Sequence, residues 1–492
     1  MKIFVKMPLV LLVTLFTFYS CYTDSLEDDL DGGIIENTDD DDGDNDDDSV
    51  NDQLNYKIIP NDFDWSDIPD GYSESIWKIG YDFDLEGIAV TLPNNVTLKF
   101  TGGSLNNYTS ISGANTKIDT GLVGSFDGTG VLIETWDLER IYPEWYGAIG
   151  DGTHYDADAF NSAVRFLNTM GGGDLILTAG KDYVIDKEIL LYSHINIRGH
   201  NANMSVATTT YDVSPNRFFA IFTTLHIDKR PMSAPYSTFG TGIIRFSNIH
   251  IKDITFNLNR DGNTTALNYM RSSDFNAIRF VDTENSSVEN CNFIDGQTKD
   301  IWTLVAVLTL EKSNNCKVVN NTFDGCTAIA VDQGYGNIIE GNTTSNSPGT
   351  HVEVFKGSYH QIINNTFGNQ FYAVSTVGTS AKHSIVRGNT ILESNVSGIT
   401  VGHRNETEEA DYGADYSIIE DNIIYGGPVS EVTGRMGIFV QNGISLRIRN
   451  NEIYNLYKTT ESTTKSAGII ISGATTNEEQ AWHDDLIIEG NI

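Results

Sequence analysis

One short sequence motif, called the phrase below, recurs from the middle of the chain to its last residues. Each copy contains one Asn at an equivalent position near its end, called the closing Asn below. It reads Val-Val-Asn-Asn-Thr-Phe at 318–323 and Ile-Ile-Asn-Asn-Thr-Phe at 362–367. Successive closing Asn residues are 21, 23, 24, 33, 29 and 40 positions apart. Such a period, with apolar doublets, predicts a β-solenoid with one coil per repeat, in which the longer repeats carry extruded loops. The chain's last residue, Ile492, falls within a copy, so we expect either a truncated sequence or a last strand edge covered by a loop. The closing residues are Asn321, Asn342, Asn365, Asn389, Asn422, Asn451 and Asn491.

The closing Asn has two properties that suit the turn of a solenoid. Asn tolerates the left-handed backbone conformation that a tight turn needs. Its side-chain amide can also bond the equivalent Asn of the coils above and below, as in stacked amide ladders. We therefore predict a ladder in which Asn365 is buried between Asn342 and Asn389. An earlier copy, at 288–293, has Cys291 in the Asn position.

The residues before the repeats resemble those of a known family. Trp145-Tyr146-Gly147-Ala148-Ile149-Gly150-Asp151-Gly152 resembles the Phe-Gly-Ala-x-Gly-Asp-Gly motif near the start of pectate-lyase-like right-handed parallel β-helices. An acidic helix, a Gly run at 171–173 and a strand follow, as they do in that family. The resemblance covers residues 141–492 and implies an all-β fold, a right-handed parallel β-helix. It implies no single activity, because the superfamily includes lyases, hydrolases, epimerases and phage tailspikes.

The N-terminus has the features of an exported protein with a lipid anchor. Two lysines precede an apolar run at 8–18, which is too short for a transmembrane helix. The sequence Phe-Tyr-Ser-Cys that follows resembles a bacterial lipobox with Cys21 as the lipidated residue, and an ordinary cleavage site with a chance Cys is the alternative. We therefore expect a signal peptide at 1–21 and a lipoprotein exposed on the surface of the bacterial outer membrane.

The remaining chain divides into three parts. Residues 22–52 contain 15 Asp or Glu and no Lys or Arg, so 22–55 should be a disordered acidic linker. Residues 56–140 alternate with period two, which predicts either an N-terminal β-domain or the first, irregular coils. Residues 141–492 form the predicted β-helix. The net charge of −36 argues against nucleic acid as a partner, and we expect a monomer.

A helix and an insertion interrupt the predicted strands. Residues 156–169 predict an amphipathic helix, with Asp156 and Asp158 at its start, that plugs the open end of the solenoid. Residues 200–240 break the repeat and predict a groove wall or a lid. The three cysteines of the repeats should be free, buried thiols. These cysteines are Cys291, Cys316 and Cys326.

A second strand follows each turn, and its outward side chains form a candidate site. Strand residues alternate between two faces, so aligning these strands by their last apolar residue directs one row of side chains outward. Glu311 and Asp332 share one position on neighbouring coils, where like charges destabilise a sheet. Such a pair binds a cation, shares a proton or serves catalysis. The alternative is a solvated row of acidic side chains without a functional role. The row contains Arg279, Glu311, Asp332, Glu353, Phe355, Thr376, Thr400 and Gln441.

Two catalytic arrangements fit this row. Glu353 is offset from Asp332 by two residues and one coil, roughly 8 Å, which lies within the ~6.5–9.5 Å range of an inverting glycoside hydrolase. The second arrangement involves Lys356, because the run 356–367 resembles, without gaps, a stretch of chondroitinase-B and alginate-lyase β-helices. That resemblance implies Lys356 as the general base of a β-elimination and nearby carboxylates that hold calcium, here Glu311, Asp332 and Glu353.

The sequence departs from the lyase pattern on the next coil. Those enzymes have an Arg-His-Gly element where this chain has Val-Gly-Thr at 377–379. His403 and Arg404 lie one coil further, roughly 10 Å away, as candidates for the catalytic acid and the carboxylate clamp. The expected substrate-binding residues are Arg279, Trp302 and Phe355.

These observations leave three hypotheses of function. The one we favour is a surface-anchored lyase that cleaves an acidic, uronate-containing polysaccharide by β-elimination. The second is an inverting glycoside hydrolase that uses Asp332 and Glu353. The third is a non-catalytic adhesin or glycan-binding solenoid. Because the protein is acidic, a polyanionic substrate would need a local basic site or a bridging cation such as calcium.

Overall fold

The computed structural model describes residues 55–121, 124–128, 130–208, 219–224, 241–259, 275–296, 306–347, 349–369, 375–394, 396–402, 413–426, 435–456, 467–472 and 485–492. The predicted signal peptide with Cys21 and nearly all of the acidic linker lie outside these ranges. In the ranges given, no helix is both long enough and apolar enough to cross a membrane.

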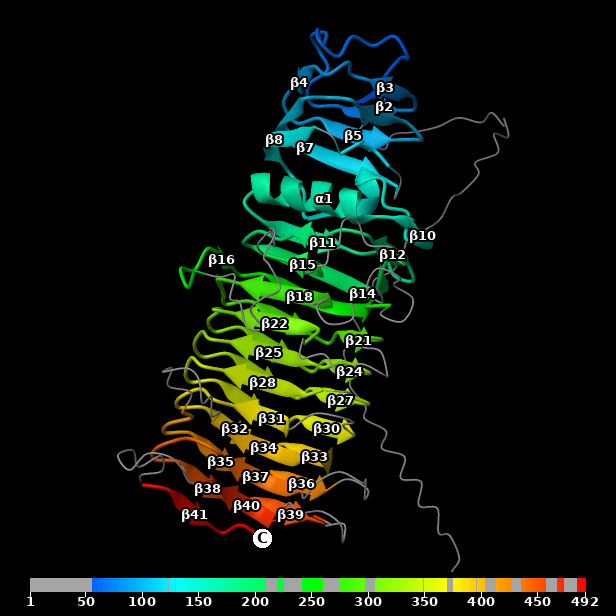
Figure 1. The fold of residues 1–492 in the computed structure, drawn as a ribbon. Coiled ribbons are helices and arrows are strands. Elements are labelled where there is room, and N and C mark those ends of the chain that lie inside the picture. Colours follow the sequence, from blue (N-terminus) through cyan, green and yellow to red (C-terminus); the bar gives the residue numbers. More distant parts are fainter. Residues whose placement is uncertain are drawn as a thin grey trace, which may run out of the picture. The chain divides into compact units, whose positions relative to one another are not determined.

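The main body is a β-helix whose coils each contribute three short strands (Figure 1). Each strand pairs in parallel with the equivalent strands of the coils before and after it. The fold is therefore all-β, a right-handed parallel β-helix, as the sequence predicts. Two successive coils consist of β25 (Ile329–Asp332), β26 (Ile338–Glu340) and β27 (Thr343–Ser345), and of β28 (Val352–Phe355), β29 (Gln361–Ile363) and β30 (Thr366–Asn369).

Two sheets run along these coils. Over the described residues, the first sheet has ten strands and the second has 21, which form the other two arms of each coil. Besides β25 and β28, the ten-stranded sheet contains β13 (Ile189–Leu190), β15 (Phe219–Thr223), β18 (Phe275–Val281), β22 (Leu308–Glu311), β31 (Ser375–Thr379), β34 (Ser397–Val401), β37 (Met436–Val440) and β40 (Ala467–Ile471). The second sheet adds β9 (Arg140–Ile141), β10 (Asp151–Tyr155), β11 (Gly173–Ile176), β12 (Asp182–Ile185), β14 (Ile195–Val206), β17 (His250–Asn257), β20 (Ser287–Glu289), β21 (Asn292–Ile294), β23 (Lys317–Val319), β24 (Thr322–Asp324), β32 (Ile385–Arg387), β33 (Thr390–Ser394), β35 (Ile418–Glu420), β36 (Ile423–Gly426), β38 (Arg447–Arg449), β39 (Glu452–Tyr454) and β41 (Ile487–Glu489). A short pair, β16 (Phe246–Ser247) and β19 (Thr283–Glu284), lies beside them.

The segment 56–140 is made of further parallel coils, which decides between the two alternatives for it. Its strands pair in parallel over repeats of about one coil, for example Tyr56 with Ile76 and Ile76 with Thr97. The N-terminal segment is therefore the first group of coils. Its strands are β1 (Tyr56–Ile58), β2 (Ile76–Ile79), β3 (Asp82–Asp84), β4 (Ala89–Thr91), β5 (Thr97–Phe100), β6 (Ser104–Asn106), β7 (Ser110–Thr120) and β8 (Val131–Trp136).

The predicted helix forms as α1 (Ala157–Thr169), next to the short 3-10 helix η1 (Pro143–Tyr146). Its apolar face buries Phe160 and Leu167 and contacts β11 and β13 of the main coils. Its other side contacts β8, where the rings of Phe166 and Trp136 lie 5.5 Å apart. The helix thus covers the end of the main coils, but the N-terminal coils stack on its other side, so it is an internal plug rather than a terminal cap (Figure 1).

Asp156 stands at the helix start but does not cap it with its side chain. The carboxylate accepts hydrogen bonds from the backbone N–H groups of Ile149 at 2.7 Å and Val184 at 3.1 Å. Asp156 thereby ties the glycine-rich turn that precedes the helix to β12. The turn itself needs glycine, since Gly150 and Gly152 have φ of 60° and 76°.

The Asn ladder forms as predicted. Each side-chain amide donates to the Oδ1 of the Asn on the next coil at 2.9–3.0 Å, in an unbroken series from Asn321 to Asn491. Each Nδ2 also donates to a backbone carbonyl, as Asn365 does to Ile339. Asn365 is buried between Asn342 and Asn389. The ladder satisfies polar groups inside the protein that would otherwise be costly to bury.

The left-handed residue of the turn is the one before the ladder Asn, so this part of the prediction was wrong. Asn320, Asn364 and Asn450 have φ of 56–57°. At the equivalent positions Gly341, Gly388 and Gly490 have φ of 63–66°. One position of the phrase therefore provides the turn conformation and the next provides the buried amide.

The three cysteines of the repeats are free and buried, as expected. Burial raises the pKa of each thiol to about 12. The Cys291 backbone N–H donates to Oδ1 of Asn321 at 2.9 Å, so the ladder ends against the coil that has Cys in place of Asn. Next to the ladder, Phe256, Phe293 and Phe323 stack inside the coils, with ring centroids 5.1 and 4.6 Å apart.

Two details of the sequence alignment differ from the structure. Part of the predicted insertion at 200–240 is regular, because β14 extends to Val206 and β15 joins the ten-stranded sheet. In β31, Val377 pairs with Val352, whereas the alignment matched Val377 with Val354. The register is shifted by two residues, so Gly378 is the neighbour of Glu353. Thr376, which was expected on the outward row, is fully buried.

Candidate functional site

The face of the ten-stranded sheet carries the carboxylates that the sequence singled out. Glu311 of β22 pairs with Asp332 of β25, and Asp332 pairs with Phe355 of β28, as the alignment predicts. Glu353 pairs with Ala330, two residues before Asp332. Along β25 and β28, buried residues alternate with half-buried ones, so the apolar residues point inward and Asp332 and Glu353 point outward.

Glu311 is part of a buried ion pair. It is fully buried, and its carboxylate accepts a 2.5 Å bond from Nη2 of Arg279, which is itself only 7% exposed. Arg279 offsets the charge of Glu311 inside the protein, where an unpaired carboxylate would be costly. The structure therefore places neither Arg279 nor Glu311 on an exposed surface for contact with substrate or a cation.

The Asp332 carboxyl has a strongly perturbed pKa. Burial raises it to about 6, and the negative charge of Glu311 adds to the effect. The positive charges of Arg279, Lys356 and Lys312 act in the opposite direction. The side-chain carboxyl of Asp332 accepts no hydrogen bond from any residue in the ranges given above, so its oxygens are available to a ligand. A half-buried carboxyl of this kind marks a candidate functional residue.

Glu353 has the higher pKa of the two, and burial alone raises it to about 7. Its direct partners on the adjacent strands are two small residues, Ala330 and Gly378. Like that of Asp332, the side-chain carboxyl of Glu353 has no hydrogen-bond partner within the described part of the chain. A substantial fraction of molecules therefore carry a protonated Glu353 at neutral pH.

Lys356 lies at the edge of this face, in a column of turn residues. The strands β18, β22, β25 and β28 are each followed by a residue with left-handed backbone. The turn holds Lys356 close enough to Asp332 to lower the pKa of that carboxyl. The column consists of Asp282, Lys312, Gln333 and Lys356, with φ of 49°, 46°, 68° and 54°.

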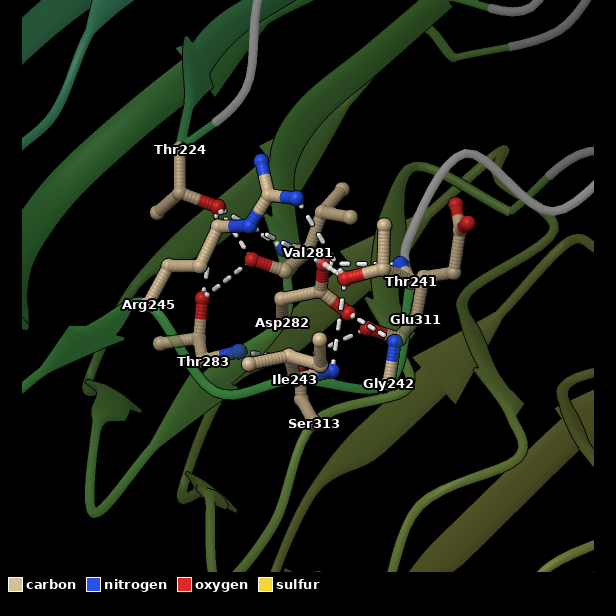
Figure 2. A network of polar contacts seen from close by, with 10 residues as sticks. All are labelled: Thr224, Thr241, Gly242, Ile243, Arg245, Val281, Asp282, Thr283, Glu311 and Ser313. Carbon is tan, nitrogen blue, oxygen red and sulfur yellow. Dashed lines mark hydrogen bonds and ion pairs between the residues drawn. The ribbon is translucent and has the colours of Figure 1, made fainter.

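Figure 2 shows how the edge of the face is anchored beside Glu311. The carboxylate of Asp282 accepts hydrogen bonds from the backbone N–H groups of Thr241 at 2.8 Å and Gly242 at 2.7 Å, and from the Thr241 hydroxyl at 3.0 Å. The Asp282 N–H donates to the carbonyl of Glu311 at 3.1 Å. Asp282 therefore has a structural role, fixing the segment at 241–243 against the coil that carries Glu311.

Three of the predicted site residues, Trp302, His403 and Arg404, lie outside the described residues. Phe355 is half-buried and is the register partner of Asp332. Across the described ranges, no group of three His, Cys, Asp or Glu side chains is placed to hold a metal ion. The calcium site stays a prediction.

The sequence interpretation missed a column of aromatic rings on the turns that follow the ten-stranded sheet. Tyr335, Tyr359, His383 and Tyr416 lie on successive coils, with ring centroids 5.1, 4.6 and 4.9 Å apart. The three tyrosines are about half exposed. Three of these residues stand two positions before the next strand, a spacing that could have revealed the column.

Comparison with known proteins supports the fold. Residues 305–480 match the family described as "Right handed beta helix region". No curated protein sequence matches the chain. The surface adhesin PfbA of Streptococcus pneumoniae superposes with a TM-score of 0.51 at 17% identity, over 72% of this chain and 85% of the adhesin.

Two further solved structures superpose with lower TM-scores. The tailspike of E. coli bacteriophage HK620, in complex with a pentasaccharide, has a TM-score of 0.46 at 13% identity, over 71% of each chain. An alginate lyase from Paenibacillus has a TM-score of 0.40 at 10% identity, over 64% of this chain and 96% of the lyase. At such identities the likeness concerns the fold alone. The coil register of the described residues and the family match over residues 305–480 together identify the fold as a right-handed parallel β-helix.

Proposed function

We propose that this protein is a glycan-cleaving enzyme in which Asp332 and Glu353 are the pair of catalytic carboxyls. The observation that carries the proposal is the pair itself. Both carboxyls are half-buried, have raised pKa values and lie one diagonal step apart on the same face. Two carboxyls whose surroundings give them different protonation states are typical of glycoside hydrolases.

The two pKa values suggest separate roles. Glu353, with the pKa near 7, is the general acid that protonates the leaving oxygen of the glycosidic bond. Asp332, with the pKa near 6, is mostly ionised at neutral pH and is the base that activates a water molecule. The Glu353 pKa is raised by burial and not by a second carboxylate, which argues against a pair that shares one proton.

The spacing favours an inverting reaction. Diagonal neighbours on adjacent strands are roughly 7–8 Å apart. Carboxyl separations of roughly 6.5–9.5 Å leave room for a water molecule between acid and base, whereas retaining enzymes need about 5–5.5 Å. The coils repeat every ~4.8 Å, so a long glycan can extend over several coils beside the pair.

A lyase is the second candidate, and the closeness of Lys356 to Asp332 favours it. In that mechanism Lys356 removes the proton from C5 of a uronate, and His403 or Arg404 acts as the acid or holds the carboxylate. Calcium held by Asp332 and Glu353 would offset the charge of the uronate. We place this second, because Glu311, the third expected calcium ligand, is already paired with Arg279.

We also propose that the enzyme is exported and held on the outer membrane by a lipid on Cys21. The proposal rests on the lipobox-like sequence that ends at Cys21. Mass spectrometry of the mature N-terminus and fractionation of a Cys21→Ser variant test it. An unlipidated N-terminus with unchanged fractionation would contradict the anchor.

The experiment that tests the function is a panel of neutral and uronate-containing polysaccharides. New reducing ends without absorbance of unsaturated uronate would support the hydrolase. New reducing ends with that absorbance would support the lyase. Retention of a glycan on a column of immobilised protein, without any cleavage, would replace both proposals with a binding protein.

A further inference from the structure

A second candidate site lies on the 21-stranded sheet, on coils that precede the carboxylate pair. A pocket of about 230 Å³ opens between three consecutive coils. Its lining comes from β14, β17 and β20 and is mainly polar. The polar lining residues are Asn196, Arg198, His250, Lys252, Ser287 and Glu289.

The coil register explains why these side chains meet. Asn196, His250 and Ser287 are Cα partners on successive coils and form one column. Arg198, Lys252 and Glu289 form a second column two residues further along each strand. The residues between the columns include Ile197 and Ile251, which are fully buried in the core. Strand alternation therefore directs all six polar side chains outward, and the pocket lies among them.

The charges in the pocket are only partly compensated. Nε of Arg198 lies 3.0 Å from the Asp174 carboxylate, so this guanidinium already has an acidic partner. The ammonium group of Lys252 forms no hydrogen bond or ion pair with any residue of the described coils, although Glu289 is its register partner. The side-chain carboxylate of Glu289 is likewise without a hydrogen bond or ion pair there, whereas its backbone carbonyl accepts one from the Cys291 thiol. One ammonium group and one carboxylate are thus both available to a ligand.

His250 and Ser287 add neutral hydrogen-bonding groups. Nδ1 of His250 lies 2.8 Å from the Ser287 hydroxyl, which leaves Nε2 of the ring for another partner. Burial lowers the pKa of His250, against the opposing effect of Glu289, so the imidazole is neutral at neutral pH. Nδ2 of Asn196 donates to Asp174 at 2.7 Å, which leaves its Oδ1 as an acceptor.

We propose that this pocket binds a single sugar unit that bears a carboxylate, with the carboxylate at Lys252 and the hydroxyls at Glu289, His250 and Asn196. The volume is below the roughly 300–1,000 Å³ of pockets for drug-sized ligands, which suits one sugar ring. Several donors and acceptors around one uncompensated ammonium match a polyhydroxylated monoanion. The choice of a glycan rests on the proposed function, and the pocket adds a holding site for the same polymer on a second sheet.

The test uses the methyl glycoside of galacturonic acid, which has a free carboxylate. Its binding is measured by calorimetry and by ligand-observed NMR. Methyl galactoside is the neutral comparison, and a sulfated methyl galactoside is the second anion. We expect the carboxylated sugar to bind, and the Lys252→Gln variant to bind it at least tenfold more weakly. Lys317→Gln is the matched control, because Lys317 follows Ser287 in the same column, is exposed and lies outside the pocket.

Three outcomes would overturn the proposal. These are equal binding of the neutral sugar, binding of only the sulfated sugar, and an affinity for the carboxylated sugar that Lys252→Gln leaves unchanged. Equal melting temperatures of the two lysine variants confirm that both are folded. The measurement is independent of catalysis, since Glu353→Gln should retain this binding. A protein that cleaves no glycan would refute the proposed function and leave the pocket result standing.

Discussion

Asp332 and Glu353 are linked through the pairing of Ala330 with Glu353, which sets their side chains one diagonal step apart on the same face of the sheet. The backbone hydrogen bonds of two adjacent coils fix this offset. The flanking strands β22 and β31 pair in the same parallel manner, so neither carboxylate is on an edge strand. Two carboxyls held by a rigid sheet in this way are preorganised to act on a substrate bound between them.

The pH dependence of kcat/KM should be bell-shaped. Cleavage requires an ionised Asp332, which is lost as the pH falls through about 6, and a protonated Glu353, which is lost as the pH rises through about 7. We expect a maximum between these two values. Initial rates on the best glycan of the panel, from about pH 4 to about pH 9, measure it. A rate that stays at its maximum above pH 8 would exclude Glu353 as the general acid.

The buried ion pair should tune the acidic limb of that profile. The charge of Glu311 raises the pKa of Asp332, so Glu311→Gln should move the limb to lower pH. Arg279 lowers the same pKa, so Arg279→Met should move the limb to higher pH. Arg279→Met also leaves Glu311 buried without its partner and should cost about 3–5 kcal/mol of stability.

The double variant Arg279→Met/Glu311→Leu is the control for this pair. It removes both charges, so it should be more stable than Arg279→Met alone. Urea unfolding measures the stabilities, and the pH profile measures the limb. Identical acidic limbs in wild type, Glu311→Gln and Arg279→Met would show that the pair does not act on Asp332.

The raised pKa of Glu353 should make the protein less stable at high pH. The folded state binds this proton more tightly than the unfolded chain, so the stabilisation is complete below about pH 4 and is lost as the pH rises through about 7. Glu353→Gln removes the buried charge. It should raise the free energy of unfolding by about 1–3 kcal/mol at pH 8 and give no such gain at pH 4.

Unfolding of wild type and Glu353→Gln at the two pH values measures this difference. Glu340→Gln is the matched control, because Glu340 is also a half-buried strand carboxylate but lies on the other sheet. An equal gain for both variants would mean that the effect reflects net charge rather than the surroundings of Glu353.

Loss of one ladder amide should destabilise the solenoid. Asn365→Ala removes the bond to Asn389 and leaves polar groups of the adjacent coils without partners. We expect a loss of about 1–3 kcal/mol in urea unfolding. Asn364→Gly is the control, because Gly occupies this left-handed position in neighbouring coils, and its cost should be smaller. Equal effects of the two substitutions would contradict the ladder's contribution.

The sequence predicted the features that repeat with the coil. The closing Asn of each phrase predicted the ladder, and strand alternation predicted that Glu311 and Asp332 share a position. The alignment failed at β31, because Val377 and Val354 are both apolar ends of a short strand and alternation alone does not distinguish a shift of two residues. Only the backbone pairing identifies Gly378 as the neighbour of Glu353.

Other features depend on tertiary contacts that no local pattern contains. The burial of Glu311 follows from its pairing with Arg279 and from the packing around it. Its position in the strand alone predicts an outward, exposed side chain. The placement of α1 between two groups of coils required recognition that residues 56–140 are coils themselves. The pocket at Lys252 could have been found, since polar residues flank one apolar residue in three successive phrases.

The most direct test of the account compares turnover by Glu353→Gln, Glu340→Gln and Lys356→Ala on a glycan that the wild type cleaves. We predict that Glu353→Gln lowers kcat by about 10²–10⁴ fold, that Glu340→Gln is as active as wild type, and that Lys356→Ala retains most of the activity. Full activity of Glu353→Gln together with an inactive Lys356→Ala would contradict the carboxylate mechanism and identify Lys356 as the base.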